Sequence, residues 1–121
     1  MQKKKIVVAE DNSTLSMLLK FRLEKEGHEL FIAPDGKQAL EFIQEHEPNM
    51  IITDIMMPFV NGLEVISHVR FKLNKDTPII VFSAAGQEEM VLKAFNLGAN
   101  DFMSKPFSPN ELMIRVNKLL D

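Results

Sequence analysis

The sequence predicts an α/β domain built on a doubly wound, five-stranded parallel sheet. Short, continuous apolar runs alternate along the chain with segments that have helical spacing. Strands that are apolar at every position are typical of parallel sheets with helices on both faces. The 121 residues suit one compact domain and are too few for two ordinary ones. We therefore expect a single domain over residues 1–121.

The five predicted strands are runs of β-branched and aliphatic residues, of which the last is the weakest. They cover residues 5–9, 29–33, 50–53, 78–82 and 101–103. The helical segments lie between these runs and after the last one. In one small domain, this alternation implies right-handed crossovers between parallel strands.

The ends of the predicted helices carry residues that satisfy free backbone groups. Gly27 and Gly98 stand where the first and fourth helices need a left-handed residue at the C-terminus. The second, third and fifth helices each begin with a polar side chain, and a residue three positions later can return its hydrogen bond. These pairs are Asp35 with Gln38, Asn61 with Glu64, and Ser108 with Glu111, where Pro109 takes the first helical position.

Apolar side chains fall on one face of each of the last two predicted helices. We expect these side chains to be core residues without a binding role. They are Met90, Ala94 and Leu97 in the fourth helix and Leu112, Val116 and Leu119 in the fifth.

The composition limits the classes of function. A hydrophobic content of 45%, with 26% charged residues and a net charge of -3, is typical of a globular domain without a nucleic-acid surface. The absence of cysteine excludes disulfides and thiolate metal sites. The apolar run after the basic N-terminus covers only residues 6–9, and no stretch approaches a membrane span. We expect a cytoplasmic protein, with His28, His46 and His68 at surface or boundary positions.

Polar residues stand at the carboxyl ends of the predicted strands, where doubly wound sheets form their sites. They are Glu10, Asp11, Asp54, Ser83 and Lys105. Three crowded carboxylates repel one another unless they bind protons or a cation. Oxygen ligands without histidine or cysteine select Mg²⁺ or a similar ion, which keeps water that a phosphate can replace. Such a pocket can accept a phosphoryl group, with Lys105 and Ser83 directed to its oxygens.

Each of these residues has an ordinary structural role when taken alone. Asp54 and Ser83 suit turns, Lys105 suits a solvated surface, and Glu10 with Asp11 complements the N-terminus of a helix. The functional interpretation depends on compatible groups at all four strand ends together.

Four motifs resemble those of the receiver domains of two-component response regulators, the family that includes the bacterial chemotaxis receiver. They are VVAEDN at 7–12, IITDIMMPFVNGLE at 51–64, IIVFSA at 79–84 and GANDFMSKPFSPNEL at 98–112. The resemblance extends over residues 4–120. It implies a flavodoxin-like three-layer sandwich with strand order 2-1-3-4-5.

The resemblance also implies a role for each site residue. Asp54 is the expected acceptor of a phosphoryl group from a sensor histidine kinase or a histidine phosphotransfer protein. The expected Mg²⁺ ligands are Asp11 directly, Glu10 through water, Asp54, and the backbone carbonyl of Met56. Ser83 and Lys105 match the hydroxyl and the lysine that bind the transferred phosphoryl group.

The expected output is a conformational switch. In the family, the residue matched by Ser83 couples to an aromatic residue on the fifth strand, here Phe102. The signalling face for a downstream protein or effector domain then consists of the fourth helix, the fifth strand and the fifth helix. The Lys105–Pro106 peptide bond is expected to be cis. A receiver is a signalling phosphoacceptor and no enzyme, since it catalyses only its own phosphorylation and slow dephosphorylation.

Phe102 stands where tyrosine is frequent, so a simply packed Phe102 is the alternative to a switch. Three other classes of protein compete with a phosphorylated receiver. A pseudo-receiver that only docks is disfavoured because no site position is lost. A flavodoxin-type FMN carrier is disfavoured because Glu10 and Asp11 repel a phosphate, and the chain has no tryptophan or tyrosine to stack on the flavin. An aspartate-nucleophile phosphohydrolase needs a second acid where this chain has Met56.

Overall fold

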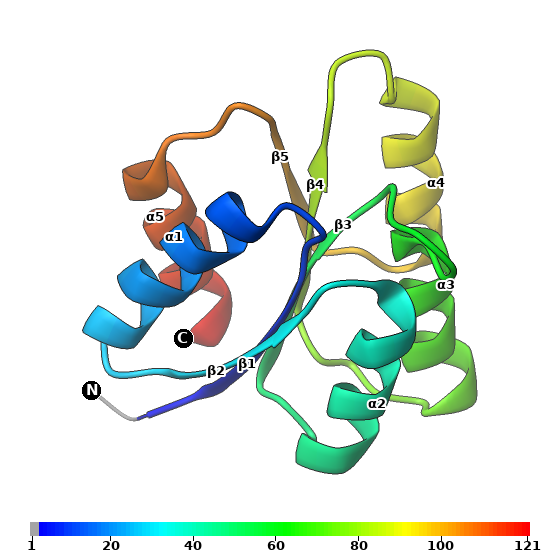
Figure 1. The fold of residues 1–121 in the computed structure, drawn as a ribbon. Coiled ribbons are helices and arrows are strands. Elements are labelled where there is room, and N and C mark those ends of the chain that lie inside the picture. The colour runs from blue at the N-terminus through cyan, green and yellow to red at the C-terminus, as the bar shows by residue number, and fades with distance from the viewer. Residues whose placement is uncertain (1–2) are drawn as a thin grey trace.

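A computed structural model describes residues 3–121, which form a five-stranded parallel sheet between two layers of helices (Figure 1). The strands are β1 (Lys5–Ala9), β2 (Glu29–Ala33), β3 (Met50–Asp54), β4 (Ile79–Ser83) and β5 (Asp101–Ser104). The helices are α1 (Ser13–Lys25), α2 (Gly36–His46), α3 (Gly62–Ser67), α4 (Glu88–Leu97) and α5 (Pro109–Leu120), with a π-helical turn η1 (His68–Lys72) after α3. The strand order is β2-β1-β3-β4-β5, which confirms the predicted fold class.

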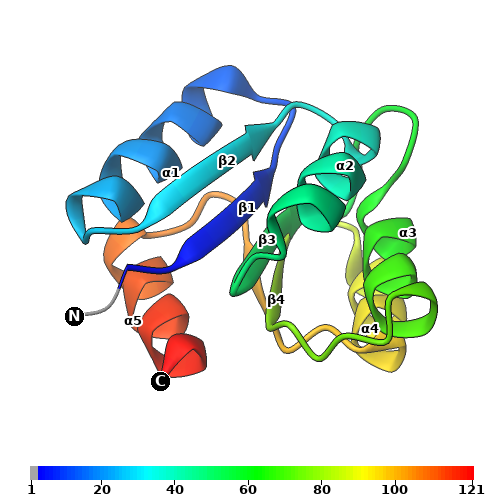
Figure 2. The ribbon, with the colours of Figure 1, turned by 90° about the horizontal axis from the view of Figure 1, so that it is seen from below.

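The two layers of helices cover opposite faces of the sheet. Figure 2 shows α1 and α5 on one face and α2, α3 and α4 on the other. Among the described residues no helix has the length and apolar character that a membrane span requires.

Successive side chains of the central strands enter two different hydrophobic cores. In β1, Val7 packs on the side of α2 to α4, whereas Ile6 and Val8 pack on the side of α1 and α5. Ile51 and Ile52 of β3 divide in the same way, and both are fully buried. Each such side chain contributes about 1.5–3 kcal/mol through burial. Burial on both faces is the physical reason for the continuous apolar runs of the sequence.

Four strand ends, in three of the strands, differ by one residue from the predicted bounds. β3 includes Asp54, β4 runs from Ile79 to Ser83, and β5 includes Ser104. Asp54 and Ser83 are thus the last residues of neighbouring parallel strands, with Asp54 in register with Phe82. The sheet places both polar side chains at its carboxyl edge.

Most of the predicted helix ends are confirmed. Asn61 and Glu64 form a complete capping box. The Asp35 side chain accepts from the Gln38 N–H, but the predicted return bond from the Gln38 side chain is absent among the described residues. Gly27 and Gly98 have φ angles of +92° and +118°, in the left-handed region.

The predicted capping box of α5 is only half right. The Ser108 hydroxyl accepts from the Glu111 N–H at 3.4 Å. The Glu111 carboxylate, however, accepts from Arg115 at 3.0 Å, and Arg115 also donates to both oxygens of Asp101 at 2.7 Å. A charged partner one turn away competes successfully with a neutral backbone N–H.

His28 contradicts the expected surface or boundary position of the histidines. It is only 5% exposed, and neither of its ring nitrogens has a hydrogen-bond partner within residues 3–121. His46, by contrast, stacks on Phe31 at a centroid distance of 3.8 Å. Burial lowers the pKa of His28 because the charged ring loses its water.

This burial predicts a loss of stability in mild acid. The unfolded chain takes up the proton of His28 first, so His28 costs no stability above pH 6.5, its ordinary pKa, and destabilises the fold as pH falls through the folded-state pKa. The slope for one proton is at most about 1.4 kcal/mol per pH unit. Urea unfolding of wild type and His28→Phe between pH 7 and pH 5 is expected to show a shallower decline for the variant. Equal declines would contradict the inferred burial of a neutral ring.

Candidate functional site

Glu10, Asp11 and Asp54 come together at the carboxyl ends of β1 and β3. One carboxylate oxygen from each of the three residues lies within 4.8 Å of the other two. Glu10 and Asp54 are buried, whereas Asp11 is exposed. The strand ends thus bring these acids together as the sequence predicted. The cluster is open to solvent on the side of Asp11.

Lys105 joins this cluster from the loop after β5. Its Nζ donates to Asp54 Oδ2 at 2.7 Å and lies 2.8 Å from Glu10 Oε1. The backbone N–H of Lys105 donates to the Ser83 carbonyl at 2.8 Å, which ties the loop to the end of β4. The Lys105–Pro106 peptide bond is cis, in agreement with the expectation.

The charges of the pocket depend on one another. Burial raises the pKa of Glu10, while the ion pair with Lys105 and the hydrogen bond from the Asn12 N–H act in the opposite direction. Burial would lower the pKa of the Lys105 ammonium, but its hydrogen bond to Asp54 and its ion pair with Glu10 outweigh burial and raise it. Lys105 therefore stays charged, and its ammonium favours the ionised form of Glu10.

The donor atoms of the cluster fit a magnesium ion. Glu10 Oε2 accepts from the Asn12 N–H at 3.0 Å, but Oε1 is buried and has no well-formed hydrogen bond to any described residue. Its 2.8 Å approach to Lys105 is an ion pair without hydrogen-bond geometry, so the oxygen can still bind a cation or water. Hard carboxylate oxygens beside an exposed Asp11 suit an ion that keeps part of its hydration shell.

Ser83 and Met56 lie at the same edge of the sheet. Ser83 is buried as the last residue of β4, next to Lys105. Met56 lies in the loop two residues after Asp54 and is half exposed. The Met56 carbonyl remains a predicted metal ligand.

Phe102 lies at the surface of β5, where its ring contacts Phe95 of α4 edge-on at a centroid distance of 5.9 Å. Together with Ser83 and Lys105, both rings line an open groove of about 600 Å³ beside α4. The groove connects the predicted switch residues Ser83 and Phe102.

Three supporting residues were not predicted. Asn12 caps α1 with its side chain and donates its N–H to Glu10, while the Thr53 hydroxyl donates to the Asp54 carbonyl at 2.9 Å. A Cβ atom on Gly62 would overlap the Asp54 backbone. The sequence did not reveal this contact, because Asn-Gly is an ordinary turn dipeptide and the close approach to Asp54 is visible only in the fold.

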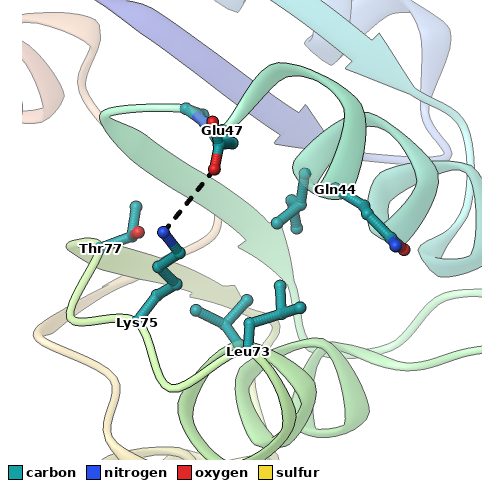
Figure 3. Close-up of a pocket in the computed structure, with 8 residues that line it drawn as sticks. Gln44, Glu47, Leu73, Lys75 and Thr77 are labelled. Atoms are coloured by element: carbon teal, nitrogen blue, oxygen red, sulfur yellow. Dashed lines mark ion pairs between the residues drawn. The ribbon is translucent and has the colours of Figure 1, made fainter.

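A second cavity lies at the opposite, amino edge of the sheet (Figure 3). It has a volume of about 190 Å³ and lies between the end of α2 and the loop before β4. Glu47 and Lys75 form an exposed ion pair of 3.7 Å at its rim, above Leu73. None of the predicted site residues lines this cavity.

Comparisons with known proteins identify the class to which this fold and pocket belong. The model of the response regulator receiver domain family matches residues 6–117. The chain therefore belongs to this family, which consists of two-component signalling modules rather than enzymes.

Particular relatives agree with this assignment. The probable transcriptional regulator ycf27 of Galdieria sulphuraria is 38% identical over 119 residues, which are 98% of this chain and 46% of the relative. The chain thus spans about half the length of this curated relative. The Francisella response regulator 1452 receiver domain is 35% identical with a TM-score of 0.87, covering 97% of this chain and 96% of its own. A receiver domain protein from Clostridium thermocellum is 27% identical with a TM-score of 0.89, covering 96% and 93%.

The ion pairs of Lys105 predict how the pocket responds to loss of its ammonium. Lys105→Met leaves Glu10 and Asp54 without a cation. We expect the free energy of unfolding of this variant to be about 1–3 kcal/mol lower than that of wild type at pH 7 in metal-free buffer. The raised pKa of Glu10 means that stability is retained at low pH and lost as pH rises through that value. The loss should therefore be smaller at pH 5, as measured by urea unfolding.

Lys118→Met, at an exposed position of α5, is the matched control and is expected to resemble wild type. A Lys105→Met variant that is as stable as wild type at pH 7, or that loses more stability at pH 5, would contradict the electrostatic account.

Proposed function

We propose that this receiver accepts a phosphoryl group on Asp54. The observation that supports the proposal best is the recessed Asp54 carboxylate, held 2.7 Å from the Lys105 ammonium within a cluster of three acids. An isolated surface aspartate has neither the fixed orientation nor the nearby cation that phosphoryl transfer requires.

The proposed reaction exchanges one bond to phosphorus for another. An Asp54 carboxylate oxygen forms the new O–P bond while the P–N bond to a donor histidine breaks, and its electron pair stays on the imidazole nitrogen. Lys105 turns from the carboxylate to the incoming phosphoryl oxygens. The Ser83 hydroxyl donates a hydrogen bond to another of these oxygens.

Glu10, Asp11, Asp54 and the Met56 carbonyl would hold the Mg²⁺ ion of the site. The bound ion supplies positive charge that neutralises the phosphoryl oxygens as they approach the acids. Within the chain, the buried Glu10 keeps its carboxylate oriented through the Asn12 N–H. The exposed Asp11 leaves the mouth of the site accessible to the donor.

The proposed donor is a sensor histidine kinase or a histidine phosphotransfer protein, and the proposed output surface is the α4–β5–α5 face. The groove beside α4 supports this output, because Ser83 and Phe102 both line it. A shift of Ser83 toward the phosphoryl group would open space for Phe102. The relative of about twice this length bears the name of a transcriptional regulator, which supports an effector domain as a recipient of the signal.

Incubation with acetyl phosphate and Mg²⁺ tests the proposal. Intact-mass spectrometry is expected to show the gain of one phosphoryl group by wild type, no gain by Asp54→Asn, and no gain when EDTA removes the ion. Asp76→Asn, which changes an exposed carboxylate before β4, is the matched control and should be labelled like wild type. Undiminished labelling of Asp54→Asn, or an unlabelled wild type, would overturn the assignment.

A further inference from the structure

Phe59, in the loop between β3 and α3, combines strain with exposure. Its φ angle is +69°, which is a conformational outlier for a bulky residue. The Val60 N–H donates to the Pro58 carbonyl at 2.9 Å and closes a three-residue γ-turn around Phe59. With a positive φ at its centre, this turn is of the rare, strained kind. The Phe59 residue is nevertheless 84% exposed, so its ring obtains little packing within the chain.

The surrounding structure fixes this turn in place. Met57 and Val60 pack against the hydrophobic core on either side of Pro58 and Phe59. The backbone of Val60 lies so close to Gly36 of α2 that a Cβ atom there would overlap it. Glycine or asparagine would adopt the same turn with less strain. The backbone conformation therefore does not require a phenyl ring at this position.

The position of the loop ties Phe59 to the mouth of the acidic pocket. The Gly62 N–H donates to the Ile55 carbonyl at 2.7 Å, so the two ends of the loop meet directly after Asp54. Phe59 is three residues from Gly62, and its Cα lies within about 11 Å of the Gly62 Cα at full extension. The exposed Met56 and Pro58 side chains belong to the same loop.

We propose that Phe59 is an anchor for the protein that donates the phosphoryl group to Asp54. This inference rests on the proposed function of Asp54. The Asp54 side chain is only 10% exposed, so a histidine of another protein must enter the pocket to reach it. A protein interface of about 800 Å² per partner has a radius of about 16 Å, and such an interface centred on Asp54 covers Phe59.

The ring then fills an apolar depression on the donor, in a loop that needs no ordering on binding. Small phosphodonors such as acetyl phosphate enter the pocket without contacting the Phe59 ring. Phe59 is therefore a positioning residue that acts on the affinity for the donor protein and not on the chemistry at Asp54.

Phosphotransfer kinetics with two kinds of donor test the anchor. The protein donor is the autophosphorylated histidine kinase that transfers fastest to wild type among those encoded in the same genome. For Phe59→Asn and Phe59→Gly, we expect kcat/KM with this kinase to fall about tenfold or more, mainly through KM. Labelling by acetyl phosphate and the melting temperature should be at least those of wild type. Phe71→Asn, at a 65% exposed position of η1 toward the amino edge, is the matched control and should keep wild-type kinetics.

An unchanged kcat/KM of both Phe59 variants would overturn the anchor while acetyl phosphate labelling still supports Asp54 as the acceptor. Failure of acetyl phosphate to label wild type would instead overturn the proposed function. Wild-type dimers in sedimentation that dissociate in Phe59→Asn would assign the ring to a second copy of the chain and overturn the donor contact. The donor contact would also be overturned if acetyl phosphate labels wild type but no histidine kinase of the same genome transfers a phosphoryl group to it.

Discussion

The ammonium of Lys105 lies between two carboxylates that the fold buries, and the organisation of the carboxyl edge depends on this contact. Glu10 directly follows β1, Asp54 ends β3, and Lys105 follows β5. Its Nζ lies 2.7 Å from Asp54 and 2.8 Å from Glu10, so one cation joins three strands of the sheet. With Asp11, the pocket contains three acids, and within residues 3–121 the Lys105 ammonium is the one cation paired with them. The remaining negative charge is what a divalent ion can neutralise.

The sheet makes such a costly arrangement possible because its two hydrophobic cores hold the strand ends rigidly. Buried charges persist only where packing and hydrogen bonds fix their partners. The Asn12 N–H orients Glu10, Thr53 bonds the backbone of Asp54, and the Ser83 carbonyl binds the backbone of Lys105. These bonds come from residues at or beside the ends of β1, β3 and β4, so the strands themselves position the charges. The position of the pocket is therefore set by the backbone of the sheet.

The sheet and most of the site were predictable because their signals are local. Continuous apolar runs indicate strands buried on both faces, and the polar residue that ends each run marks the carboxyl edge. The features that the sequence predicted wrongly, or could not predict, depend on contacts that the local sequence pattern does not show. The burial of His28 depends on elements distant in sequence, and Glu111 leaves its predicted capping bond because its carboxylate accepts from Arg115, which also binds Asp101. The left-handed conformation of Phe59 could not be predicted, since its side chain disfavours the turn that the surrounding core imposes.

Binding of Mg²⁺ to the unphosphorylated protein tests most directly the claim that this pocket is a charge-balanced cation site. Isothermal titration calorimetry at pH 8 is expected to show one ion per chain for wild type. Binding should weaken by about tenfold or more in Asp11→Asn, a loss of about 1.4 kcal/mol. It should become tighter in Lys105→Met, where the competing ammonium is gone. Absence of binding to wild type, or equal affinity in Asp11→Asn, would contradict the account.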